Sequence, residues 1–149
     1  MKIEDEIKQK QFSNPFQKLA VNTLFTASWL QTRGTRILKP YGITIQQYNV
    51  LRILRGQHGK PASVGLLQER MLDKSSNASR LVDKLLAKKL VKRKTSPNDR
   101  RQVDILITND GLTLLNELEL KMNEWDSQLK TLSEKEALML SDLLDKLRG

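Results

Sequence analysis

The spacing of apolar residues changes once along this chain, and that change restricts the folds available to it. Up to about Lys89, apolar residues recur every three or four positions, which is typical of amphipathic helices. Residues 90–96 and 102–107 instead read as strands, and Pro97-Asn98-Asp99 between them are turn-forming residues. The helical spacing returns after Thr108. We therefore expect a mainly α-helical fold that carries one small, projecting β-hairpin.

Capping residues divide the helical parts into segments. Ser, Thr, Asn and Asp side chains accept hydrogen bonds from the free N–H groups of a first helical turn, so they mark helix starts. The predicted starts are Ser13-Asn14-Pro15, Thr44, Ser63, Ser75 or Ser76, Thr108, and Ser133 with Glu136 as a capping box. Lys39-Pro40-Tyr41-Gly42 is expected to end the first helix, and Gly34 is a candidate kink within it.

Charge is concentrated in the middle of the chain. Residues 74–101 hold ten Lys or Arg and two Asp or Glu, whereas residues 102–149 hold five and ten. A short basic block of this kind is typical of a nucleic-acid-binding element, although a solvated basic face has the same composition.

Composition excludes several classes of function. The chain has no Cys and one His, His58, so thiol chemistry, a Cys or His metal site and a Ser-His-Asp triad are not expected. No Gly-rich phosphate loop is present, and no catalytic residue or cofactor is predicted. The longest apolar run, Ala137 to Leu140, is far too short for a membrane span, and we expect a cytoplasmic protein.

The order of the elements is that of a winged helix-turn-helix: a short helix, a turn, a second helix and a two-stranded wing. On a helical wheel, the fourth helix places Ala78, Leu81, Val82 and Leu85 on one face and small, polar or basic residues on the other. Such residues can approach base edges in a major groove. The candidate DNA contacts on this helix are Ser75, Ser76, Asn77, Ser79, Arg80 and Lys84. Ser75 and Ser76 could equally serve as helix caps.

The wing is also basic. Asp99 is expected to form a salt bridge with Arg101, which would fix the tip and leave Arg100 to enter the minor groove. Lys92 and Lys94 alternate to one side of their strand and either follow phosphates or face solvent. Asp83 could pair with Lys84, Arg80 or the wing.

Four stretches closely resemble the multiple-antibiotic-resistance regulator (MarR) family. They are the recognition-helix segment from Ser75 to Leu85, Leu90-Val91-Lys92-Arg93, Pro97-Asn98-Asp99-Arg100-Arg101, and Leu106 to Gly111; Tyr41-Gly42-Ile43-Thr44 matches as well. The resemblance spans about residues 16–130. Two positions depart from the family pattern: Lys89 stands where Gly is common, and Leu67 stands where a small Ala is usual.

The resemblance implies a homodimeric transcriptional regulator, a repressor more often than an activator, that binds double-stranded DNA at a pseudo-palindromic operator. It implies a DNA-binding lobe over residues 42–108, with dimerisation helices at 14–41 and 109–149 of a single 1–149 subunit. It also implies a small aromatic or phenolic effector. Lacking Cys, the chain could not use the peroxide-sensing mechanism of one branch of the family.

Aromatic walls with a cationic anchor would suit such an effector. The candidate pocket residues are Phe25, Trp29, Tyr48, Arg52 and Trp125. Large aromatic residues also fill cores and dimer interfaces, so that role competes for Trp29 and Trp125. The residues leave one further function open, a winged-helix adaptor that docks an acidic protein partner with the same basic face.

Overall fold

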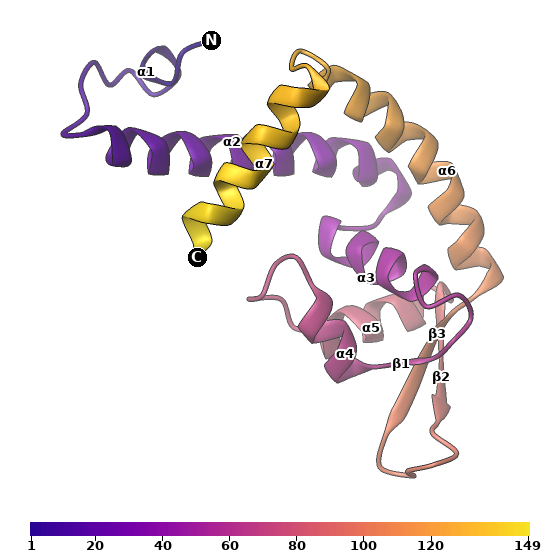
Figure 1. Cartoon of the computed structure of the whole chain (residues 1–149). Helices are drawn as coiled ribbons and strands as arrows, with labels where there is room; N and C mark the ends of the chain where they lie inside the picture. Colours follow the sequence, from indigo (N-terminus) through magenta and orange to yellow (C-terminus); the bar gives the residue numbers. More distant parts are fainter. The chain divides into compact units, whose positions relative to one another are not determined.

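The structure is a computed structural model that describes the backbone of residues 1–149 and every side chain except those of Trp125 and Gln128. The chain divides into two compact units, Met1–Ile45 and Gln46–Gly149 (Figure 1). Among the described residues, no helix is both long and apolar enough to cross a membrane.

The first unit is dominated by one long helix. A short helix, α1 (Ile3–Glu6), precedes α2 (Pro15–Leu38), and a 3-10 turn, η1 (Lys39–Tyr41), follows it. The Asn14 side chain caps α2 by accepting a hydrogen bond from the Gln17 backbone N–H, and Pro15 takes the first helical position, as predicted. The chain turns at Gly42 with a φ of 67°, a left-handed conformation that glycine adopts without steric cost.

Gly34 lies where α2 comes close to the residue that starts the next helix. A Cβ added at Gly34 would lie 3.2 Å from the Cδ1 atom of Ile45. The absence of a side chain therefore permits close packing at this point.

Three helices of the second unit gather at one end of a hairpin (Figure 1). They are α3 (Ile45–Arg55), α4 (Val64–Arg70) and α5 (Ala78–Ala87). Tyr48, Val50, Leu51, Ile53 and Leu54 of α3 are all buried, as the apolar residues on most sides of this helix predict. Ser63 caps α4 by accepting from the Leu66 backbone N–H, which confirms the predicted start.

A three-stranded antiparallel sheet forms the wing and its base, in the order β1-β3-β2. Strands β2 (Val91–Thr95) and β3 (Val103–Ile107) form the predicted hairpin. The edge strand β1 (Ala62–Ser63), which the sequence did not indicate, pairs Ala62 with Ile105. It is two residues long, so no alternating pattern could reveal it.

The base of the wing is locked to the helices on either side. The Thr108 hydroxyl donates to the Lys89 carbonyl oxygen and accepts from the Gly111 backbone N–H, while the Thr108 backbone N–H donates to the Leu90 carbonyl oxygen. Thr108 thereby caps the next helix, as predicted. Lys89 ends α5 with a φ of 59°, so the expected left-handed helix end is present without its usual glycine.

The chain ends with α6 (Asn109–Asp126), a 3-10 turn η2 (Ser127–Leu129) and α7 (Glu134–Arg148). Of the heptad-like series on α6, Leu115 and Leu118 are fully buried core residues and Met122 is half-buried. Leu129 of the same series is exposed, and the side chain of Trp125 lies outside the described residues. The predicted capping box of Ser133 and Glu136 begins α7.

The mainly α-helical winged helix-turn-helix expected from the element order is confirmed. One helix start was wrong. Neither Ser75 nor Ser76 opens α5; instead the Asn77 side chain accepts a hydrogen bond from the Arg80 backbone N–H at 3.1 Å. Asn77 has this role because Asp73 already organises the two serines in the preceding turn.

Candidate nucleic-acid interface

The outward face of α5 is polar and basic, as the wheel predicts. Ala78, Val82 and Leu85 are buried with at most 1% exposure, so the opposite side must face solvent. Ser79, Arg80 and Lys84 are exposed there. Asn77 is also exposed, but its side-chain oxygen is occupied by the helix cap, which leaves its amide N–H₂ for any ligand.

The two serines before α5 differ from each other. Ser75 is exposed, and both its hydroxyl and its backbone N–H donate to one carboxylate oxygen of Asp73, at 2.6 and 3.0 Å. These two hydrogen bonds hold the pKa of Asp73 below its usual value. The Ser76 residue is half-buried and its hydroxyl oxygen is buried, so a DNA contact through that hydroxyl stays a prediction.

The acid on the exposed side of α5 has a specific partner. Asp83 accepts a hydrogen bond from Arg93 of β2, with 2.8 Å between its Oδ1 and the Arg93 Nη2. Of the three partners considered for Asp83, the wing is the one observed. Sequence reasoning placed Arg93 in the wing but gave it no role. The signal was available, because Arg93 is two residues from buried Val91 and so faces the same side of the strand.

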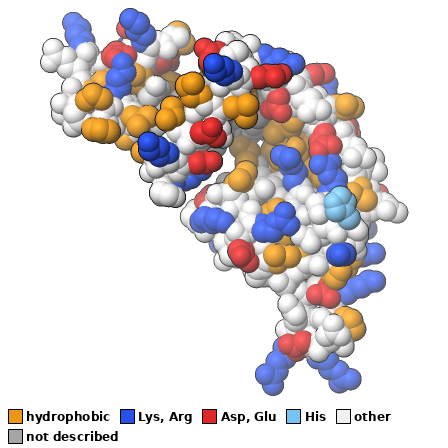
Figure 2. Space-filling view, in the orientation of Figure 1, with side chains coloured by type: hydrophobic (Ala, Val, Ile, Leu, Met, Phe, Trp, Pro, Cys, Tyr) orange, Lys and Arg blue, Asp and Glu red, His pale blue; other side chains and the backbone are white. Residues whose placement is uncertain are grey.

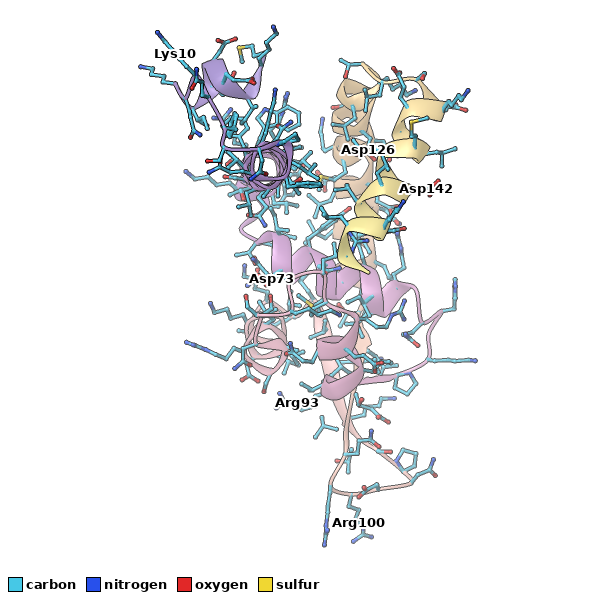
Figure 3. The ribbon with its side chains drawn as sticks, turned by 60° about the vertical axis from the view of Figure 1, so that its left-hand side comes forward. Lys10, Asp73, Arg93, Arg100, Asp126 and Asp142 are labelled. Carbon is cyan, nitrogen blue, oxygen red and sulfur yellow. The ribbon has the colours of Figure 1, made fainter. Side chains whose placement is uncertain are left out.

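The tip of the wing carries two exposed arginines, Arg100 and Arg101. Figure 2 shows Lys and Arg side chains gathered at the far end of the hairpin, and Figure 3 places Arg100 there. The predicted Asp99–Arg101 salt bridge is not found among the described side chains. Asp99 instead fixes the turn by accepting from the Arg101 backbone N–H at 2.9 Å, because a carboxylate two residues earlier reaches the backbone more easily than the long guanidinium.

Neither the Arg100 nor the Arg101 side chain therefore forms an ion pair with Asp99 among the described residues. Lys92 and Lys94 of β2 are exposed as well, on the strand face opposite to Arg93. Cations thus line α5, the wing stem and the wing tip, and all of them belong to one compact unit.

The residues predicted to form an effector pocket are divided between the two units. Phe25 and Trp29 belong to the first, and the Trp29 ring lies 4.9 Å from the Arg33 guanidinium carbon. Tyr48 and Arg52 belong to the second, where the Arg52 guanidinium carbon lies 5.9 Å from the centre of the Tyr48 ring. Burial raises the pKa of Tyr48. The fifth candidate, Trp125, has no described side chain.

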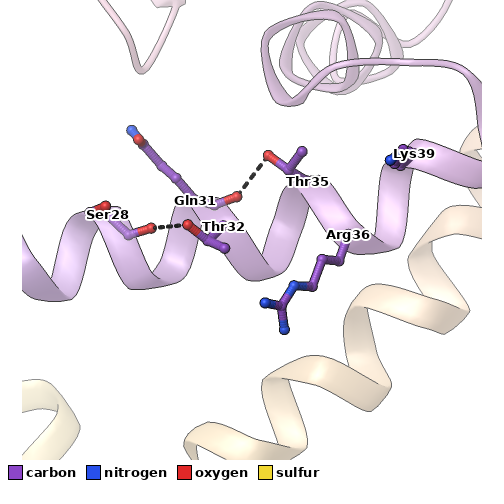
Figure 4. A pocket seen from close by; sticks show the side chains of 6 residues that line it. All are labelled: Ser28, Gln31, Thr32, Thr35, Arg36 and Lys39. Atoms are coloured by element: carbon purple, nitrogen blue, oxygen red, sulfur yellow. Dashed lines mark hydrogen bonds between the residues drawn. The ribbon is translucent and has the colours of Figure 1, made fainter.

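A hollow of about 420 Å³ lies elsewhere, on the C-terminal half of α2 (Figure 4). None of the predicted pocket residues lines it. Its described lining is polar and cationic: Ser28, Gln31, Thr32, Thr35, Arg36 and Lys39. Two of the hydroxyls are committed to the helix, since Thr32 donates to the Ser28 carbonyl oxygen and Thr35 to the Gln31 carbonyl oxygen.

The described side chains contain no group of three or more His, Cys, Asp or Glu that could hold a metal ion.

Known proteins share this architecture. A family model described as "MarR family" matches residues 41–102, which cover the helix-turn-helix and most of the wing. The HTH-type transcriptional regulator MhqR of Bacillus subtilis (strain 168) is 32% identical over 107 residues, covering 71% of this chain and 72% of that protein. The chain belongs to the MarR family.

Solved structures of MarR proteins agree with this assignment. A MarR transcription factor from Planctomyces limnophilus is 28% identical, with a TM-score of 0.69 over 91% of this chain and 98% of that one. AbsC, a MarR family regulator from Streptomyces coelicolor, shares the fold at 18% identity, with a TM-score of 0.79 over 93% and 96% of the two chains.

Membership in the MarR family confirms the resemblance drawn from the recognition-helix and wing motifs. MarR proteins are DNA-binding transcriptional regulators and not enzymes, which confirms the class of function predicted from the basic block.

Proposed function

We propose that this MarR protein is a cytoplasmic, homodimeric repressor that binds a pseudo-palindromic operator. Residues 42–108 form its DNA-binding lobe, α5 enters the major groove, and the wing reaches a flanking minor groove. Residues 14–41 and 109–149 form the dimer. A small aromatic or phenolic compound releases the protein from DNA.

One observation carries the DNA-binding part of the proposal. Arg80 is exposed on the side of α5 opposite to its buried face, and Arg100 and Arg101 are exposed at the projecting tip of the wing. A helix suits a major groove, and an arginine on a narrow ribbon suits a minor groove. We assign base contacts to Arg80 and Ser79, and phosphate contacts to Lys84, Lys92 and Lys94.

The apolar residues of α7 support the homodimer. Leu140, Leu143 and Leu147 recur at helical spacing, and each is about half-exposed or more. Such a face needs a partner in water. A twofold dimer brings two such faces together and presents two α5 helices to two half-sites of one operator.

The effector proposal rests on the Trp29 side chain and on the hollow of α2. Trp29 offers an aromatic ring beside a cation, and the hollow adds Arg36 and Lys39, which suit a carboxylate or phenolate. Gel-shift release by 4-hydroxybenzoate and phenol, with cyclohexanol as the non-aromatic control, tests it. Equal release by all three compounds, or by none, overturns this part of the proposal.

The DNA-binding part is tested by selecting sequences from a random duplex pool and measuring affinity by gel shift at several salt concentrations. Arg80→Ala is expected to weaken the selected operator about 10- to 100-fold and to relax the base preference at one position. Arg100→Ala with Arg101→Ala is expected to lower affinity and to reduce the salt slope by about two per subunit.

The matched control is Lys130→Ala with Lys135→Ala, which removes the same charge outside the lobe and should leave operator affinity nearly unchanged. If the wing variant behaves like this control, the wing does not contact DNA. If the wild-type protein selects no sequence, and a partner from lysate survives nuclease treatment, the acidic-protein adaptor replaces the repressor.

A further inference from the structure

The ion pair between Asp83 and Arg93 joins the two elements that the proposed function sets against DNA. Asp83 lies on the exposed face of α5. Arg93, labelled in Figure 3, lies in the stem of the wing, on β2. Their side chains are 61% and 45% exposed. Among the described side chains, it is the only ion pair that connects α5 with the sheet.

Stability alone does not account for this pair. An ion pair with both partners so exposed contributes little to folding. The wing is already fixed at its base by the sheet and by the hydrogen bonds of Thr108 to Lys89 and Leu90. The Asp83–Arg93 ion pair therefore acts on the stem of the wing, beyond that base, and on the position of the wing tip relative to α5.

The neighbours of Asp83 on its own helix suggest a second effect. Residues three and four positions apart on a helix are neighbours, so Asp83 faces Ser79, Arg80, Leu86 and Ala87. Arg80 is the only cation among them. An unpartnered Asp83 would attract the Arg80 guanidinium along the helix surface. With Arg93 in place, Arg80 has no ion-pair partner among the described residues and stays available to a base.

We propose that Arg93 is a positioning residue, which acts through Asp83 to hold the wing stem at α5 and to keep Arg80 free for DNA. This inference rests on the proposed function, since it assigns a task to a pair of residues between two DNA-contacting elements. It predicts that Arg93 raises the preference for the operator over random duplex, and not the affinity for DNA in general.

The test is a double-mutant cycle in the full-length protein, with Arg93→Gln and Asp83→Asn alone and combined. The readout is the ratio of affinities for the selected operator and for random-sequence duplex. Arg93→Gln is expected to lower this ratio about tenfold in the wild-type background. It should change the ratio by less than about twofold in the Asp83→Asn background, where Arg93 has no carboxylate to hold.

The matched control is Lys92→Gln, which removes one cation from the same strand but from its other face. It should lower both affinities equally and leave the ratio unchanged. Asp83→Asn alone supplies an independent readout: it should raise affinity for random duplex, because an acid leaves the DNA-facing side, while it lowers the ratio. Thermal midpoints that stay within about 3 °C of wild type establish that each variant folds.

Two results overturn the inference. One is an equal fall in the ratio on Arg93→Gln in both backgrounds, which would mean that Arg93 contacts DNA directly. The other is a fall in both affinities that matches Lys92→Gln. Either result leaves the repressor intact. A wild-type ratio near one refutes the repressor instead, and the inference with it.

Discussion

Helices α5 and α7 carry apolar residues at the same spacing, yet this chain buries only those of α5. On α5, Ala78, Val82 and Leu85 are at most 1% exposed. On α7, Leu143 and Leu147 are 57% and 54% exposed, and no described residue of that helix is buried. The two helices therefore differ in where their partners are.

The face of α5 finds its partners within the chain, which fixes the direction of its polar side. Among the described residues, none of the α7 side chains is buried, and the helix begins with a capping box. The proposed function gives recognition to α5 and assembly to α7, and it therefore predicts that each can be disturbed without the other.

A charged substitution on the apolar face of α7 should have the largest effect, which is on the stability of the dimer. Leu143→Glu removes about 2 kcal/mol of hydrophobic free energy from each half of a twofold interface. We therefore expect the dissociation constant of the dimer to rise at least about 10³-fold. Sedimentation velocity over a concentration series measures this. Ser141→Glu, which adds the same charge to the side of α7, is the control. A dimer equally sensitive to both substitutions would place the interface elsewhere.

The glycine with the closest surroundings lies at the junction between the wing and α6. A Cβ on Gly111 would lie 2.7 Å from the Ile107 Cγ1 atom and closer still to the Leu90 carbonyl oxygen. Because backbone cannot yield as a flexible side chain can, Gly111→Ala is expected to destabilise the protein by about 3 kcal/mol in urea denaturation. Gly65→Ala on α4 meets its nearest atom, the Ser63 Oγ, only at 3.8 Å. That control should be neutral or slightly stabilising.

Local chemistry could be predicted from the sequence where it depends on a few adjacent residues. Asn14-Pro15, Ser63 and the pair Ser133 and Glu136 start helices as expected, because a cap needs only the first turn that follows it. The buried and exposed sides of α5 were predicted for a similar reason, since a helical wheel describes a helix independently of its neighbours.

Features that depend on two distant segments, or on a choice between near neighbours, could not be predicted. Strand β1 exists only because β3 offers it an edge. The inward Ser76 hydroxyl follows from a turn that Asp73 organises with Ser75, and two adjacent serines look alike in a sequence. Pairing of Asp83 with Arg93, and not with Arg80, depends on where the wing stem lies. The pocket residues stay a prediction, because Phe25 and Trp29 belong to one unit and Tyr48 and Arg52 to the other.

A third prediction separates packing from charge between α3 and α6. Glu119 of α6 forms a half-exposed ion pair with Arg55 of α3, and the hydrogen bond from Arg55 lowers the pKa of Glu119. A carboxyl group whose pKa is lowered by folding stabilises the protein above its unfolded pKa, near 4.5, and loses that contribution as pH falls through the folded value.

Glu119→Gln should therefore cost about 1 kcal/mol at pH 7 and less at pH 3, by urea denaturation at each pH. Glu117→Gln, an exposed position on the same helix without an ion pair among the described residues, is the control and should show no such pH-dependent difference. A cost that is equal at both pH values would show that Glu119 contributes through packing and not through charge.

An effect of similar size and opposite sign is expected where α5 ends and the wing begins. Lys89 holds a left-handed conformation, and the N–H groups of Lys89 and Leu90 donate to the carbonyl oxygens of Leu86 and Leu85, which closes the helix in a Schellman motif. A side chain at this position costs about 1 kcal/mol relative to glycine. Lys89→Gly should therefore stabilise the protein by about 1 kcal/mol in urea denaturation.

Lys84→Gly, inside α5, is the control. It should destabilise the protein by a similar amount, because glycine gains nothing in a right-handed turn and loses more chain entropy. If both substitutions destabilise the protein, the Lys89 side chain itself contributes to stability where the wing begins. Lysine at this position, where glycine is usual in the family, then increases the free energy of unfolding.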